Sequence, residues 1–152
     1  MSLTNDYKVR AFEAEDRQDV IELWQACELT RPWNDANKDL DRMLGDPVGK
    51  LFVLTRGKQV SDQVPTLIGT VMASYDGHRG AIYYLGIHPD HQSSGAGRVL
   101  MAHSESYLKD LGCPKINLMV RSTNLSVIQF YKKLDYSEEP VVVMGKRLIP
   151  DI

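Results

Sequence analysis

A chain of 152 residues fits one domain, and it is long enough to bury a core without disulfides or a structural metal. Hydrophobic residues make up 43% and charged residues 25%, values typical of globular proteins, so disordered, fibrous and membrane-spanning classes are excluded. Eighteen Lys and Arg against 20 Asp and Glu leave a net charge of −2 and no basic stripe, so we expect no nucleic-acid partner.

The two cysteines, Cys27 and Cys113, lie in dissimilar contexts. They form no CxxC pair and lack His partners at metal-binding spacing, so we expect two reduced thiols, no disulfide and no metal. The N-terminus has no apolar signal segment. These features predict a cytoplasmic location and no membrane partner.

The first half of the chain predicts strands around two helices. Residues 7–12 alternate polar and apolar side chains, as a half-buried strand does. Asp16 is placed to cap a helix whose apolar face carries Val20, Leu23, Trp24 and Cys27. We expect a second helix at 35–44, ending at Gly45, strands at 51–55, 66–75 and 81–88, a polar loop at 57–65, and an Asp-Gly turn in the last hairpin.

The second half predicts helices at 95–111 and 124–134 and strands at 115–120 and 141–148. The hairpin excludes a purely parallel sheet, whereas the later strand-helix-strand step implies a parallel pair. We therefore predict one domain over residues 1–152, of the α/β (mixed, α+β) class, with a central mixed sheet and helices on both faces.

A glycine-rich loop follows the strand at 81–88. Residues 87–100 read IHPDHQSSGAGRVL, so Pro89 forces a turn and Gly95 and Gly97 open a helix. Such a helix start presents unpaired backbone N–H groups to an anion, and Arg98 adds a positive charge. Arg98-Val99 does not fit a P-loop, and Leu100 stands where a Rossmann fingerprint needs its third glycine.

The run QSSGAG resembles the Gln/Arg-x-x-Gly-x-Gly/Ala signature of the GNAT superfamily of N-acetyltransferases. Asn124 and Tyr131 on a later helix match that family's Asn…Tyr pair, and the resemblance follows the element order of almost the whole chain. In detail, the segments TRPWND, YDGHRGAIYYLGIHP and GKRLI resemble the YpeA-type bacterial subgroup. The resemblance implies the GNAT fold, with its parallel strand pair at the cofactor cleft, and acetyl-CoA as cosubstrate.

The resemblance also implies roles for individual residues. The pantetheine arm would pair with the strand end before the loop, and a backbone N–H near Ile87 would stabilise the thioester oxygen. Asn124, also a fitting helix cap, would bond the arm, and Tyr131, which also fits a core position, would be the general acid. Gly86 suits a strand bulge or close packing. The cofactor-binding set is Leu85, Gly86, Ile87, Gln92, Ser93, Ser94, Gly95, Ala96, Gly97, Arg98, Asn124 and Tyr131.

The general base is the position where the chain departs from relatives. Ribosomal-protein acetyltransferases of the superfamily carry a glutamate five residues before the asparagine, and Met119 stands there in this chain. The remaining candidates are a water chain or the side chains of Asp76, His78, Tyr83 and Tyr84. An amine that arrives neutral would need none of them.

By the resemblance, the acceptor site lies between the first two helices and the neighbouring strand loops. The residues there that suit recognition of a carboxylate, a ring or an ammonium group are Arg31, Trp33, Asp35, Asp76, His78 and Arg79. The acceptor would be a small-molecule or peptide amine. Ordinary loop polarity and helix capping explain the same residues without a ligand.

Two other functions stay open from sequence alone. One is a regulatory module that binds acyl-CoA without turnover, and the other is a purely structural domain. A homodimer is also compatible, because the apolar run at 141–144 suits an interface as well as a core.

Overall fold

The computed structural model describes residues 6–57 and 66–151. Five strands form one sheet, β1 (Tyr7–Ala11), β2 (Lys50–Arg56), β3 (Thr66–Tyr75), β4 (Gly80–Ile87) and β5 (Ile116–Leu118). The helices are α1 (Arg17–Ala26), α2 (Ala36–Gly45), α3 (Ala96–Asp110) and α4 (Leu125–Lys132), with short 3₁₀ turns η1 (Ala14–Asp16) and η2 (Pro89–His91). No described helix is both long enough and apolar enough to cross a membrane.

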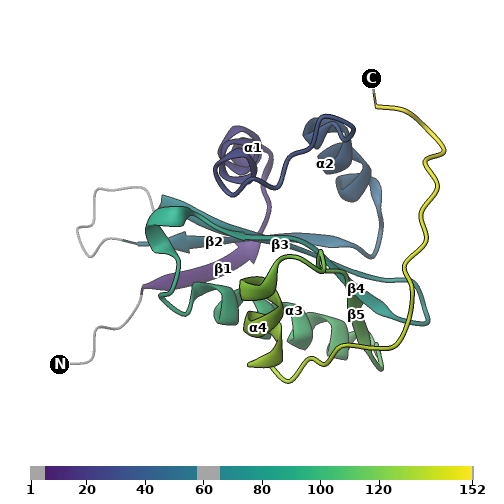
Figure 1. Cartoon of the computed structure of the whole chain (residues 1–152). Helices are drawn as coiled ribbons and strands as arrows, with labels where there is room; N and C mark the ends of the chain where they lie inside the picture. Colours follow the sequence, from purple (N-terminus) through teal and green to yellow (C-terminus); the bar gives the residue numbers. More distant parts are fainter. Residues whose placement is uncertain (1–5, 58–65, 152) are drawn as a thin grey trace.

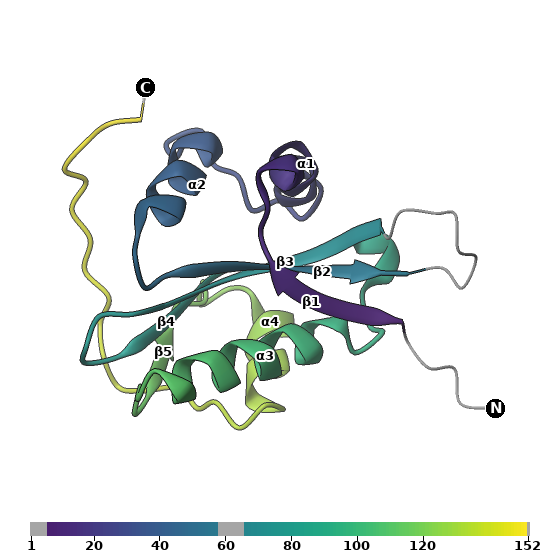
Figure 2. The ribbon, with the colours of Figure 1, turned by 180° about the vertical axis from the view of Figure 1, so that it is seen from behind.

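The sheet order is β1-β2-β3-β4-β5, antiparallel throughout except for the parallel pair of β4 and β5. Helices α1 and α2 cover one face and α3 and α4 cover the other (Figures 1 and 2). The predicted mixed sheet with helices on both faces is therefore confirmed. Helix positions agree because each helix carries an apolar stripe that the sheet buries.

Each face of the sheet has its own core. Trp24 and Leu40, from α1 and α2, pack on one face, and Leu100 and Met101 from α3 pack on the other. Trp24 also donates a hydrogen bond from its indole to Thr70 Oγ1 at 2.9 Å, and the Thr70 hydroxyl donates to the Tyr84 carbonyl at 2.9 Å. This polar chain fixes α1 against β3 and β4 at the middle of the sheet.

The predicted strand at 141–148 is wrong. After α4 the chain continues without a described helix or strand, passes the β5 edge and reaches α2 (Figures 1 and 2). The run Val141–Met144 is strongly exposed, with Met144 at 90%. High β propensity predicted a strand here, but a strand also needs hydrogen-bonded pairing with a neighbouring strand, and this segment forms none in the described chain.

Two smaller expectations need adjustment. Asp16 stands at the start of α1, but its carboxylate serves the preceding turn, accepting from the Glu13 N–H at 2.8 Å and pairing with Arg10 at 2.7 Å. The predicted loop at 57–65 falls, from residue 58 on, outside the described residues.

Candidate functional site

Half of β4 has no strand partner on the side that faces β5. The parallel pairing runs only from Gly80 to Ile82, so residues 83–87 continue past it with a free edge in the described chain. The His88 N–H donates to Ile68 in β3, and backbone groups alternate along a strand, so the N–H of Ile87 points to the free edge. An extended ligand can therefore pair with β4 as a missing strand would.

A bulge bends β4 within this free edge. Met72 pairs with Tyr83 and Thr70 pairs with Gly86, so Tyr84 and Leu85 together face one residue of β3. Tyr84 accordingly adopts a positive φ of 52°. Gly86 is not a bulged residue, because it pairs in register with Thr70. A Cβ added to it would lie 2.8 Å from Leu29 Cδ1. Of the two sequence interpretations for Gly86, the structure supports close packing.

The glycine-rich loop connects this strand end directly to α3. Ser93 and Gly95 both have positive φ, 63° and 85°, and Gly95 stands at the N-cap of α3 without a side-chain cap. Gln92 Nε2 donates to the Ile87 carbonyl at 3.0 Å, which ties the loop to the end of β4. The first-turn N–H groups of α3 have no partner within the helix and carry the positive end of its dipole.

Glycine is required at Gly95 and at Gly97 for two different physical reasons. A Cβ on Gly95 would meet nothing within 4 Å, so its positive φ alone requires glycine. A Cβ on Gly97 would lie 3.0 Å from Phe130 Cζ in α4. Gly97 is therefore required by the close packing of α4 against α3, a reason that the sequence alone did not supply.

The predicted Asn124 and Tyr131 lie at the start and the end of α4. Asn124 is the N-cap, and its Oδ1 accepts from the Val127 N–H at 3.4 Å. Tyr131 is buried at 8% exposure, edge-on to Phe130 and Tyr136. Burial raises its pKa to about 12. The phenol therefore keeps its proton at neutral pH, and no described residue is hydrogen bonded to its hydroxyl.

The structure reduces the set of candidate bases. Tyr84 donates its hydroxyl proton to Asp39 at 2.7 Å, and burial together with Asp39 raises its pKa, so it holds its proton. Asp76 accepts two backbone N–H groups, from His78 and Arg79, and these hydrogen bonds lower its pKa. Met119 is exposed.

The predicted acceptor residues divide into two groups. Asp76, His78 and Arg79 form the hairpin turn at the far end of β4, about 23 Å along the strand from Ile87 at 3.3 Å per residue. Arg31 donates to the carbonyls of Glu28 and Thr30. The residues of the hairpin turn therefore lie far along β4 from the glycine-rich loop.

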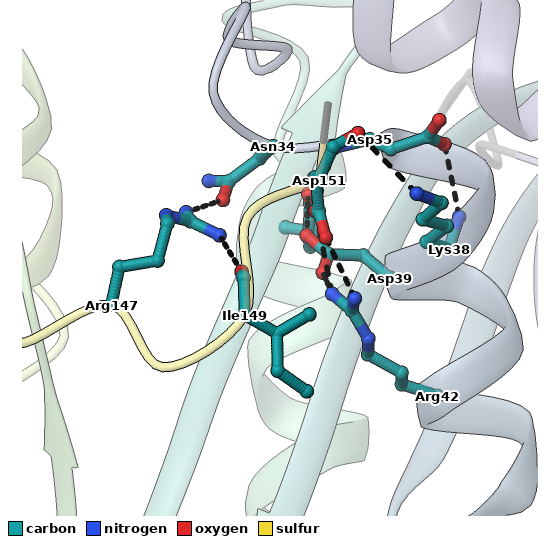
Figure 3. A network of polar contacts seen from close by, with 9 residues as sticks. Asn34, Asp35, Lys38, Asp39, Arg42, Arg147, Ile149 and Asp151 are labelled. Atoms are coloured by element: carbon teal, nitrogen blue, oxygen red, sulfur yellow. Dashed lines mark hydrogen bonds and ion pairs between the residues drawn. The ribbon is translucent and has the colours of Figure 1, made fainter.

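Asp35 and Trp33 lie in the α1–α2 connection. Asp35 caps α2 by accepting from the Lys38 N–H at 3.1 Å, the capping role that the sequence allowed. Trp33 is half exposed and lines a hollow with Arg42 and residues 145–149. The residues that sequence analysis missed, Asp39, Arg42, Arg147 and Asp151, gather beside it (Figure 3). The only sequence signal for them was the Asp39–Arg42 spacing of three along a helix.

Neither cysteine is in a disulfide, and both thiols are half-buried. Cys27 lies at the end of α1 and donates to the Ile87 carbonyl at 3.2 Å, while burial raises its pKa. In the described part of the chain, no three His, Cys, Asp or Glu residues gather as a metal site would require.

Known proteins resemble this chain in sequence and in fold. Residues 14–136 match the model of the Acetyltransferase (GNAT) family. An acetyltransferase of Yersinia pestis (strain Pestoides F) is 45% identical over 145 residues, which cover 95% of this chain and 97% of the relative. An acetyltransferase of Sodalis glossinidius (strain morsitans) is 45% identical over 146 residues, with the same coverage.

Two solved structures show the same fold at low identity. An aminoglycoside N-acetyltransferase in complex with CoA superposes with a TM-score of 0.76 at 16% identity, covering 98% of this chain and 99% of that one. Glucosamine-6-phosphate N-acetyltransferase from Arabidopsis thaliana superposes with a TM-score of 0.67 at 20% identity, covering 94% and 99%.

Proposed function

Because this chain belongs to the GNAT family of acetyltransferases, we propose that residues 1–152 act as one domain that transfers the acetyl group of acetyl-CoA to an amine. The acceptor is a small-molecule or peptide amine. One observation carries the proposal: the free edge of β4 leads, through Ser93 and Gly95, into the uncapped start of α3. Acetyl-CoA has a matching chemistry, a pyrophosphate attached to an amide-bearing arm.

The residues of this region suit each part of that cosubstrate. The first-turn amides of α3 and the exposed Arg98 would hold the pyrophosphate, and the β4 edge at Leu85–Ile87 would pair with the arm. Bound acetyl-CoA supplies an acetyl thioester. The Ile87 N–H would stabilise negative charge on the thioester oxygen as the amine attacks, an effect of a few kcal/mol at comparable sites.

The transfer would be direct. The amine nitrogen forms a bond to the acetyl carbon, the C–S bond breaks, and Tyr131 would give its proton to the departing thiolate while the amine releases one to water. Cys27 is unsuited as a nucleophile, because burial raises the pKa of its thiol, which donates to the Ile87 carbonyl. Because Tyr84 holds its proton, it would not act as a base, which agrees with an amine that arrives in the neutral form.

The alternative is a regulatory module that binds acyl-CoA without turnover. It is favoured by Met119 at the position of a catalytic glutamate and by the absence of a ready base among Tyr84, Asp76 and their neighbours in the described chain. Turnover of acetyl-CoA with a panel of amines would exclude it. The YpeA-type subgroup and the cytoplasmic location also stay predictions.

The chain would also form a homodimer. Support comes from the exposed apolar run Val141–Met144 and from β5, which pairs only with β4 in the described structure. An exposed, β-prone segment beside an open sheet edge is a common route to strand pairing between copies.

The cosubstrate site is tested by reversing one charge. Arg98→Glu places an anion in the first turn of α3, so calorimetric titration should give an acetyl-CoA Kd at least tenfold weaker, with dephospho-CoA and NADH as comparison ligands. Lys109→Glu changes the net charge equally at the other end of the same helix and should keep the wild-type Kd. Equal affinity in all three proteins would reject the α3 site.

A further inference from the structure

An open hollow of about 640 Å³ lies between the α1–α2 region and the last residues of the chain. Trp33 and Arg42 form one side, and residues 145–149, which include Lys146 and Arg147, form the other. The two sides are more than 100 residues apart in sequence. The hollow therefore exists only because the chain end returns to α2.

Asp151 holds the chain end in this place. Its side chain is only 1% exposed; its carboxylate pairs with Arg42 at 2.7 Å and accepts from the Asp35 N–H at 2.9 Å (Figure 3). Lys38 Nζ adds a hydrogen bond to the Asp151 carbonyl at 3.3 Å. This buried carboxylate, bonded to two partners, anchors the chain to α2 just beyond residues 145–149.

The charges that line the hollow are all positive. Arg42 is neutralised by Asp39 and Asp151. Arg147, in contrast, donates to Asn34 Oδ1 and to the Ile149 carbonyl, both uncharged (Figure 3). Neither Arg147 nor Lys146 forms an ion pair with a carboxylate among the described residues. Two exposed cations without anionic partners, beside the half-exposed Trp33 ring, suit a ligand that has a carboxylate or phosphate next to an apolar group.

A chain of polar contacts leads from Arg42 in the hollow through Asp39 to Tyr84 in the β4 bulge. Arg42 Nη1 contacts Asp39 Oδ1 at 3.1 Å, and Asp39 Oδ2 accepts from the Tyr84 hydroxyl at 2.7 Å. Tyr84 is itself the bulged residue of β4 and stacks on Trp24, with ring centroids 4.0 Å apart. A ligand in the hollow would thus lie on the α1–α2 face of the sheet, near the middle of β4.

We propose that this hollow binds the anionic group of the acceptor, so that the preferred acceptors are amines that also carry a carboxylate or a phosphate. This inference rests on the proposed acetyl transfer. Arg147 is the main recognition residue, because its planar guanidinium can bind a carboxylate or phosphate through two hydrogen bonds. Trp33 supplies the apolar wall, and Asp151 is a positioning residue that keeps Arg147 in place.

Matched amine pairs test the preference by turnover. Phenylalanine and phenethylamine differ by a carboxylate, and O-phosphoethanolamine and ethanolamine differ by a phosphate. The wild type should acetylate the anionic member of at least one pair with a tenfold or higher kcat/KM. Arg147→Ala should remove that preference through KM while keeping the rate on the neutral member. Arg17→Ala, which removes an arginine of α1 outside the hollow, should keep the preference.

Binding without turnover separates this inference from the proposed function. The indole N–H signal of Trp33, assigned with Trp33→Phe, is followed by NMR during titration with N-acetylphenylalanine and N-acetylphenethylamine. The anionic compound should bind at least tenfold more tightly to the wild type and lose that advantage in Arg147→Ala. Such a result with no acetylation of any amine would reject the enzyme and keep the anion site. Equal binding of both compounds by the wild type would overturn the anion site even if acetyl transfer occurs.

Discussion

At the residue scale, Tyr131 is the side chain for which we propose the most specific chemistry, that of the general acid. Its pKa of about 12 keeps the phenol protonated over the whole neutral range. Tyr131→Phe should lower kcat by about 10²-fold or more, the usual size of a lost acid, and leave the acetyl-CoA Kd unchanged. The measurement is steady-state turnover combined with calorimetry. No alkaline decline in rate due to Tyr131 is expected below about pH 11.

Tyr136 provides the matched control for that substitution. It packs edge-on against Tyr131, and its buried hydroxyl has no hydrogen-bond partner among the described residues. Tyr136→Phe removes an unsatisfied polar group, so stability should hold or rise slightly, by up to about 1 kcal/mol, with turnover unchanged. Equal losses in both variants would mean that the ring cluster, rather than a proton from Tyr131, supports the rate.

The sequence predicted site residues where a motif specifies backbone geometry. The glycine-rich pattern predicted a helix start at Gly95, whereas its positive φ was found only in the structure. The contact of Gly97 with Phe130 and the pairing of Asp151 with Arg42 join residues far apart in the chain. No local pattern encodes such contacts, so they were found only in the folded molecule.

At the scale of elements, the helices and the first five strands were predictable because the spacing of apolar residues within each one indicates which of its faces is buried. The prediction of a strand at 141–148 failed, because its run of valines has high β propensity but does not determine which sheet edge it would pair with. Propensity is local, whereas strand pairing depends on geometry that the rest of the chain creates. The run is exposed in the described chain rather than part of the core, and we propose that a partner covers it.

That partner is expected to be a second copy. The wild type should sediment at about twice the 17.2 kDa chain mass, and Val142→Lys should shift it to the monomer, because Val142 is 86% exposed and its valine side chain would become buried on pairing. Leu44→Lys, an exposed apolar residue of α2, is the control. A wild type that stays monomeric at high concentration in analytical ultracentrifugation would contradict the pairing.

At the scale of the whole molecule, the attachment of the chain end to α2 depends on ionised groups. Arg42, and then the Asp35 N–H, lower the pKa of Asp151 to about 2. At the start of α1, the hydrogen bond from Arg10 likewise lowers the pKa of Asp16. Because the unfolded chain has ordinary carboxyl pKa values near 3.8, it binds more protons than the native state between about pH 4 and pH 2.

Stability should therefore decline as the pH falls through this window and be fully present above it. Urea unfolding at pH 6, 4 and 3 should show the decline as a falling midpoint. Asp151→Asn should lower the midpoint at pH 6 and flatten the decline, because the group that gains a proton is gone. Arg42→Gln should flatten it similarly, and the double variant should add little, since both substitutions break one contact. If the urea midpoint of Asp151→Asn declined with pH as steeply as that of the wild type, the chain end would not be held by this ion pair in solution.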